Sequence, residues 1–288
     1  MDKTEDTVYL KCKDHTVSGK SFSLVPDENH KMLRTSPAPG VEELPEYYKS
    51  EDYISHTDAR RSWFEKIYHL VKNYALKQKL KYINAENPEK GMLLDIGAGT
   101  GDFLTVAKND GWKVSGTEPN ASARKRAGEK GVSLIEKTDA SFVRKHISSY
   151  DVITMWHVLE HVPNLEEQLQ ELKELLKKSG TLFIAVPNFR AYDAKHYGAY
   201  WAAYDVPRHL WHFSADAIRS LFSEKGMKVV RTIPMKFDAF YVSLLSEKYK
   251  NGKMNFFRAL WTGWLSNRKA ARTGEYSSLI YVIKHQNN

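Results

Sequence analysis

The stretch from Gly91 to Leu104 constrains the fold of this chain more than any other part of the sequence. It opens with a short apolar run, passes through three alternating glycines at Gly97, Gly99 and Gly101, and ends in a helix-forming pattern. Glycine has no Cβ, so these positions tolerate positive φ and let a ligand approach the backbone closely. We therefore predict a strand, a tight turn and the start of a helix, which is the ground plan of a nucleotide-cofactor site.

The spacing of these glycines argues against a dinucleotide. A dinucleotide fingerprint needs its third glycine at the position of Asp102. Asp95 and Asp102 flank the helix start with negative charge, which would repel a pyrophosphate and suits a ligand with an ammonium and a sulfonium. Glu118 ends the next predicted strand, where a carboxylate can accept hydrogen bonds from both ribose hydroxyls. A solvated acid at a strand end is the alternative for Glu118.

Helices and short apolar strands alternate along the main part of the chain, which is typical of βαβ units in a parallel sheet. After the first strand we expect strands at 113–117, 132–136, 151–156, 180–186, 228–234 and 277–284. We expect helices at 104–109, 121–130, 140–146, 165–178 and 214–225, the last capped by Ser214. The predicted fold is α/β, a Rossmann-like doubly wound, seven-stranded, mostly parallel sheet with helices on both faces.

Two further segments precede this pattern. Residues 1–56 are predicted to be an N-terminal arm that consists of a degenerate small module and a lid loop. This arm should be irregular apart from β-like pieces at 7–10 and 21–25. A helix at 57–84 should cover the sheet, because apolar residues that include Leu70 and Tyr74 recur at helical spacing.

The main domain is accordingly predicted to span 57–288. It contains the cover helix and an insertion at 238–276 before the last strand.

Length and composition limit the class of protein. A chain of 288 residues can bury a large core. No apolar run approaches the roughly 20 residues that span a bilayer, and the polar start at Met1–Asp6 is unlike a signal peptide. The single cysteine, Cys12, excludes an internal disulfide and a multi-cysteine zinc site. We therefore expect a cytoplasmic protein and no bound metal.

Several motifs together carry a resemblance to a known family. The run Leu94–Gly101, Glu118, the pair Asp139-Ala140 and the run Trp156–Val162 resemble class I S-adenosylmethionine-dependent methyltransferases. Within that class they are similar to the ubiquinone-biosynthesis-like branch, which methylates small molecules. A Pro-Arg-His-Leu stretch before a Ser-capped helix, here 207–210, also recurs in that branch. The resemblance covers about residues 91–236 and implies S-adenosylmethionine as cofactor, with S-adenosylhomocysteine as product.

The resemblance also implies roles for individual residues. It puts the methionine part of the cofactor beside Asp95, Gly97 and Gly99, the ribose on Glu118 and the adenine amine near Asp139. The complete cofactor-binding set, of which the last two border the reaction chamber, is Asp95, Gly97, Ala98, Gly99, Gly101, Phe103, Glu118, Pro119, Asp139, Ala140, Trp156 and His157.

Methyl transfer from a sulfonium is an in-line displacement, so the protein mainly aligns the two reactants and excludes water. A hydroxyl acceptor would also need a general base with a pKa near the working pH, and histidine fits that need. The candidate bases are His157, His161 and His209, with His212 nearby. Each of them is alternatively a structural hydrogen-bonding group.

Aromatic residues in the expected loops predict either an apolar acceptor pocket or the packing of a cover element. The candidate acceptor-binding residues are Tyr53, Tyr200, Trp201, Tyr204, Arg208 and Trp211. Arg208 has an alternative role as the ion-pair partner of Asp205, which would hold the loop.

Charge and the insertion bear on partners. The net charge is +8, but the basic residues are spread widely, which favours a solvated basic surface. Residues 254–272 combine bulky aromatics with basic flanks, so they could contact a membrane surface, cover the substrate or form a dimer contact. The chain is expected to be a monomer or a homodimer. No nucleic-acid partner is expected, because Met155–Val158 replaces the Asp/Asn-Pro-Pro-aromatic motif of base-amine methyltransferases.

We predict S-adenosylmethionine-dependent methyl transfer to an oxygen or carbon of a small, apolar or aromatic organic acceptor. The alternative is a cofactor-binding protein without catalysis, such as a scaffold or regulator. An NAD-dependent oxidoreductase is a third, weaker hypothesis.

Overall fold

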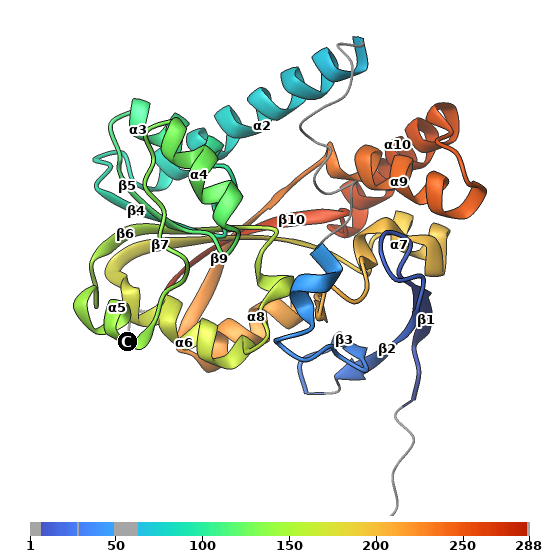
Figure 1. The fold of residues 1–288 in the computed structure, drawn as a ribbon, viewed down its shortest axis with the longest axis horizontal. Coiled ribbons are helices and arrows are strands. Elements are labelled where there is room, and N and C mark those ends of the chain that lie inside the picture. Colours follow the sequence, from blue (N-terminus) through green and yellow to red (C-terminus); the bar gives the residue numbers. More distant parts are fainter. Residues whose placement is uncertain (1–6, 28, 49–62, 287–288) are drawn as a thin grey trace, which may run out of the picture.

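The computed structural model describes residues 7–27, 29–48 and 63–286, and it describes the side chains of the helix that begins at Trp63 from residue 70 onward. A mostly parallel sheet lies at its centre (Figure 1). The sheet's strands are, in spatial order, β5 (Lys113–Thr117), β4 (Met92–Ile96), β6 (Tyr150–Trp156), β7 (Leu176–Pro187), β10 (Ser278–His285) and β9 (Met227–Pro234). β10 runs antiparallel to both of its neighbours, and the pairings among β5, β4, β6 and β7 are parallel. The predicted α/β class is confirmed.

The predicted number of strands is wrong by one. Within the described ranges this sheet has six strands, and the expected strand at 132–136 forms only an isolated bridge between Ile135 and Thr117. Val132 is buried, but Ile135 is 41% exposed and is followed by the exposed Glu136. The apolar face of this segment is short, since burial ends after Val132 and Leu134, and among the described residues the segment makes only this bridge beside β5.

Helices cover both faces of the sheet (Figure 1). One face carries α2 (Trp63–Glu86), α3 (Asp102–Asn109) and α4 (Ala121–Glu129), and the other carries α5 (Ala140–Lys145), α6 (Leu165–Leu175) and α8 (Ala215–Glu224). Side chains alternate between the faces along a strand. In β4, Leu93 joins the core that contains Leu104 of α3, and Leu94 joins the core that contains Leu169 of α6. Ser214 caps α8 as predicted, accepting from the backbone N–H of Ala217 at 3.1 Å.

Helix α2 is buried along only part of its length. Leu76, Leu80 and Ile83 pack on the sheet. Leu70 is 69% exposed and Tyr74 is 51% exposed, so the buried stripe predicted through these two residues is wrong. The N-terminal part of the helix projects beyond the sheet (Figure 1), so these side chains do not join the core between the helix and the sheet.

The N-terminal arm is more regular than predicted. It contains β1 (Leu10–Lys13), β2 (Ser21–Asp27) and β3 (Met32–Ser36), which pair antiparallel in that order. β8 (Trp211–His212) pairs with β3, so a strand from the C-terminal half completes this sheet. Pairing partners this distant in sequence leave no local signal. The domain boundary after residue 56 stays a prediction.

Arg208 ties the N-terminal sheet to the loop that precedes β8. The residue is 4% exposed, pairs with Asp205 through both Nε and Nη2, and lies 3.6 Å from Asp14. Its Nη1 also donates to the carbonyl of Tyr47 at 3.0 Å. Burial opposes the charge of Arg208, but the two carboxylates outweigh it and raise the pKa of the guanidinium. This geometry matches the loop-holding alternative for Arg208.

The insertion before β10 is a helix pair, α9 (Asp238–Asn251) and α10 (Phe256–Thr273), which packs beside α7 (Tyr192–Tyr197). The pair stands at one end of the molecule (red and orange, right in Figure 1). None of the helices in the described residues has both the length and the apolar character needed to cross a membrane.

Loss of Arg208 should destabilise the chain far more than loss of an exposed arginine. Arg208→Ala leaves the carboxylates of Asp14 and Asp205 without their cation, and breaking a buried pair costs about 3–5 kcal/mol. Arg219→Ala removes an exposed pair with Asp216 and is the matched control, expected to cost under about 1 kcal/mol. Denaturant unfolding measures both losses, and equal losses would contradict the role given to Arg208.

Candidate functional site

The glycine turn joins β4 to α3, as predicted. Gly97 and Gly99 both have positive φ, 71° and 55°. A Cβ added to Gly97 would lie 2.5 Å from Cγ2 of Val158, whereas a Cβ added to Gly99 would meet no described atom within 4 Å. Gly97 therefore lets the turn pack against the segment after β6, and Gly99 borders open space that a ligand can fill.

Glu118 lies beside this turn, at the end of β5. One carboxylate oxygen accepts from the backbone N–H of Gly99 at 2.9 Å, and the other accepts from Asn120 at 2.8 Å. These bonds hold the half-buried carboxylate at the turn, and each oxygen keeps a further lone pair for a ligand hydroxyl. The position is compatible with the ribose-binding role that the sequence predicts.

Asp95 is buried at the end of β4. It accepts a hydrogen bond from Thr154 of β6 at 2.6 Å. Burial raises the pKa of the Asp95 carboxyl, and the Thr154 bond and the charge of Lys79 oppose that rise. Asp95 therefore supplies a carboxylate whose protonation depends strongly on its neighbours.

Lys79 is a site residue that the sequence analysis missed. It projects from α2, with its ammonium 4.4 Å from the centroid of the Trp156 ring. Burial lowers the pKa of Lys79, against the attraction of Asp95 and Asp238. The available signal was a lysine on the packed face of an amphipathic helix, between Leu76 and Ile83.

Trp156 ends β6 with an unused donor. Its ring makes an edge contact with Phe103, with centroids 5.3 Å apart. Its indole N–H is buried without a hydrogen-bond partner among the described residues. Leaving such a group unpaired costs about 1–3 kcal/mol, which an acceptor atom of a ligand would restore. This donor, the open space at Gly99 and the Glu118 carboxylate fit a cofactor that carries a ribose and an amino-acid part.

The remaining predicted cofactor residues take backbone or capping roles. Ala98 donates its N–H to the carbonyl of Thr117 at 2.8 Å, and Gly101 is the N-cap residue of α3. Asp139 caps α5 by accepting from the N–H of Phe142 at 2.7 Å, which lowers the pKa of this exposed carboxyl. Pro119 and Ala140 are exposed beside Glu118 and Asp139.

His157 is held between two carboxylates. Its backbone has a φ of 58°, and its ring nitrogens lie 3.4 Å from Glu160 and 3.2 Å from Asp238. Burial opposes protonation, but the two carboxylates outweigh it and raise the pKa of His157 to about 9. A ring that is charged at neutral pH has no free lone pair. His157 therefore suits orienting these carboxylates better than accepting a proton.

Glu160, His161 and His209 form a buried cluster. One donor atom from each lies within 4.8 Å of the others, and the two histidine rings meet edge to face at 4.6 Å. Glu160 is 1% exposed, and its carboxylate oxygens lack a well-formed hydrogen bond in the described part of the chain. Burial and the charge of His209 lower the pKa of His161 to about 4, so its ring is neutral. The cluster can act on a proton or hold a divalent cation, although the sequence analysis named no metal ligand.

Backbone carbonyls favour one tautomer for both of these histidines. Nδ1 of His209 lies 2.9 Å from the carbonyl of Ala203. Nδ1 of His161 lies 3.1 Å from the carbonyl of Arg208 and 2.9 Å from the hydroxyl of Tyr48. A proton on Nδ1 satisfies each carbonyl and leaves Nε2 as the unprotonated nitrogen.

The predicted acceptor-binding aromatics are mostly packed into the protein. Trp201 and Tyr204 are buried against the N-terminal sheet, and the Trp201 N–H donates to Asp193 at 2.8 Å. Trp211 is half-buried and donates to the carbonyl of Val162 at 2.8 Å. Tyr200 is 40% exposed. Tyr53 lies outside the described residues.

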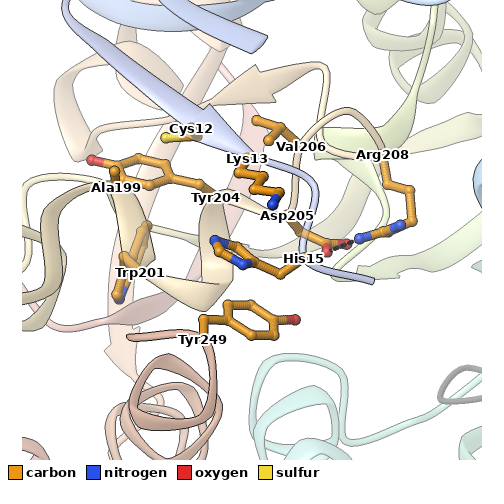
Figure 2. A pocket seen from close by; sticks show the side chains of 10 residues that line it. All are labelled: Cys12, Lys13, His15, Ala199, Trp201, Tyr204, Asp205, Val206, Arg208 and Tyr249. Atoms are coloured by element: carbon orange, nitrogen blue, oxygen red, sulfur yellow. Dashed lines mark hydrogen bonds and ion pairs between the residues drawn. The ribbon is translucent and has the colours of Figure 1, made fainter. Parts of the chain in front are cut away.

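A hollow is lined by residues of β1 and of the segment 199–208 (Figure 2). Cys12 lines this hollow, and burial raises the pKa of its thiol to about 12. His15 also lines it and stacks on Tyr249, with ring centroids 4.6 Å apart. The volume of the hollow, about 230 Å³, includes space open to solvent. None of its lining residues belongs to the glycine turn, so we do not assign the acceptor to it.

A doubly wound sheet with a glycine turn and a strand-end carboxylate at one edge defines a Rossmann-like protein that binds a nucleotide-type cofactor. A family model described as "Methyltransferase domain" matches residues 67–232, more than half of the chain. The chain therefore belongs to this family, as a class I S-adenosylmethionine-dependent methyltransferase.

Curated relatives match part of the chain. A ubiquinone biosynthesis O-methyltransferase of Actinobacillus pleuropneumoniae is 35% identical over 128 residues, which cover 40% of this chain and 55% of that protein. The chain spans about half the length of several curated relatives that it matches.

Solved structures share the fold. Magnesium protoporphyrin IX methyltransferase from Synechocystis PCC 6803, with bound SAH, has a TM-score of 0.56 at 12% identity and covers 86% of this chain and 100% of that one. A possible histamine N-methyltransferase from Thermotoga maritima has a TM-score of 0.51 at 19% identity, covering 77% and 94%.

Alanine at Gly97 and at Gly99 should have different effects. Both substitutions force a side chain into positive φ, which costs about 1–2 kcal/mol. Gly97→Ala adds the contact with Val158, so it should destabilise the chain by about 1–3 kcal/mol more than Gly99→Ala does. Gly99→Ala should instead weaken binding of S-adenosylhomocysteine, measured by calorimetric titration. Equal losses of stability would contradict the packing assigned to Gly97.

The charge of His157 predicts a pH-dependent contribution to stability. Because its folded pKa of about 9 lies above the usual value of 6.5, its stabilisation is complete below pH 6.5 and is lost as the pH rises through 9. His157→Asn removes the charge, and asparagine tolerates positive φ. The difference in unfolding free energy between wild type and variant should shrink across this range, and a constant difference would contradict the assignment.

Proposed function

We propose that this methyltransferase acts on an oxygen or carbon of a small, apolar or aromatic organic acceptor. The observation that carries the proposal is that two sets of groups lie at or just after the ends of β4, β5 and β6. The glycine turn, Glu118 and the Trp156 N–H fit the cofactor. Next to them, in sequence and through the Val158 contact, lies the buried cluster of Glu160 and His161.

The residues at the cofactor end of the site would bind S-adenosylmethionine and orient it. Glu118 would accept the ribose hydroxyls, and the turn at Gly97 and Gly99 would let the methionine part approach the backbone. Lys79 supplies a cation suited to the methionine carboxylate, while Asp95 suits its ammonium group. S-adenosylmethionine supplies, when bound, a methyl group on an already activated sulfonium.

The acceptor end of the site handles a proton. His161 is neutral with a pKa of about 4, so its Nε2 suits accepting a hydrogen bond from an acceptor hydroxyl, and Nε2 of His209, which is buried against it, could take the proton. His157, with its raised pKa, would hold Glu160 and Asp238 in place. The relatives named as ubiquinone biosynthesis O-methyltransferases support an oxygen acceptor on an apolar molecule.

Glu118→Ala should weaken binding of S-adenosylhomocysteine by about 1–3 kcal/mol, the loss expected for hydrogen bonds to a charged group. Glu136→Ala is the matched control, because Glu136 is exposed and lies 3.7 Å from Arg124 in a surface pair. Calorimetric titration of both variants measures the change. Unchanged affinity in Glu118→Ala would contradict the ribose assignment.

Transfer of labelled methyl from S-adenosylmethionine to a panel of phenols and apolar alcohols tests the acceptor class. We expect labelled product that extracts into organic solvent and forms more slowly in His161→Asn, with unchanged cofactor affinity. Cofactor binding without transfer to any panel member or metabolite extract would contradict the proposal and favour the non-catalytic alternative.

A further inference from the structure

Helix α10 exposes its largest side chains. Phe257 is 88% exposed, Trp261 63%, Leu260 56% and Trp264 43%. These residues are spaced three and four apart, so they lie on one face of the helix. We call these four residues, three aromatic residues and one leucine, the aromatic stripe. A stripe of this size on the outside of a helix is the reverse of what core packing produces.

The opposite face of α10 fixes the helix in this orientation. Its buried residues are small: Ala259, Thr262, Gly263, Ser266 and Ala270. A Cβ at Gly263 would lie 2.6 Å from the ring of Phe240 in α9, and the hydroxyl of Ser266 donates to the buried Asp193 at 2.7 Å. Such close contacts leave no room for the aromatic stripe to rotate inward.

The charge around the aromatic stripe has a single sign. Residues 250–273 contain six basic residues and no acidic one: Lys250, Lys253, Arg258, Arg268, Lys269 and Arg272. The guanidinium of Arg268 lies 5.3 Å from the ring centroid of Trp264, so cation and aromatic share one surface. A partner of this surface must therefore offer an apolar region that the aromatic rings can enter and negative charge around that region.

Direct contacts link α10 to residues near the glycine turn. Asn267 of α10 donates to the carbonyl of Lys236 at 2.9 Å, and the adjacent Phe237 is 49% exposed. The rings of Phe237 and Tyr74 meet at 5.6 Å, and Asp238 pairs with His157 of the site. These contacts place α10 near His157, one of the candidate site residues.

We propose that the aromatic stripe docks this chain on an anionic lipid bilayer surface. Aromatic rings inserted at the headgroup level, with lysines and arginines beside anionic lipids, satisfy both the apolar and the charged features. A second copy of the chain is a poorer partner, because a symmetric contact would bring the two cationic segments together. The proposal concerns a surface and does not depend on methyl transfer.

Sedimentation of the full chain with vesicles tests the proposal. Phosphatidylcholine vesicles are compared with equimolar phosphatidylcholine and phosphatidylglycerol, without cofactor. We expect binding to the anionic vesicles that weakens as salt increases. The Phe257→Ser/Trp261→Ser variant should lower that binding at least about tenfold, because it removes the apolar side chains that would be buried in the bilayer. The matched control is Val41→Ser/Val230→Ser, which removes exposed apolar side chains elsewhere and should leave binding unchanged.

Charge and assembly are separated by two further measurements. Arg268→Glu/Arg272→Glu should weaken binding to anionic vesicles while leaving the melting temperature unchanged, because both side chains are exposed. Analytical ultracentrifugation of wild type and the Phe257→Ser/Trp261→Ser variant measures self-association. The proposal is overturned if the wild type binds neither kind of vesicle, or if the variant loses only self-association and keeps vesicle binding.

Discussion

The contact between Gly97 and Val158 is the constraint on which the site depends. The glycine turn at the end of β4 lies so close to the segment after β6 that no Cβ fits at Gly97. The parallel pairing of β4 with β6 brings the segments after them together, and Glu118 is hydrogen-bonded to the turn at Gly99. The glycine at 97 therefore matters first for letting these two segments pack closely, and Gly99 then leaves room for a ligand.

Local chemistry was sufficient to predict much of the fold. β5 falls on the residues expected from its apolar run, and Ser214 caps α8 because a hydroxyl before a helix can accept an orphan N–H. Features that need distant partners were missed or wrong. The pairing of β3 with β8 and the exposure of Leu70 depend on where other elements end, which no local pattern encodes.

The candidate site shows the same difference between features that have a local signal in the sequence and features that depend on distant partners. The glycine spacing and Glu118 predicted the cofactor end, since each residue's role follows from its place next to a strand. Lys79 was missed because its position over Trp156 depends on how α2, which is distant in sequence from β6, packs on the sheet. The charge states of His157 and His161 differ although the residues are close in sequence, because His157 pairs directly with Glu160 and Asp238, whereas burial and the charge of His209 outweigh the carboxylates near His161.

A crystal structure of the chain with S-adenosylhomocysteine tests the central claim most directly. We predict that the homocysteine part lies along Gly97 and Gly99, that the ribose hydroxyls donate to Glu118, and that a ligand atom accepts from the Trp156 indole N–H. A ligand bound away from the glycine turn, with the Glu118 carboxylate and the Trp156 N–H still unliganded, would contradict the account.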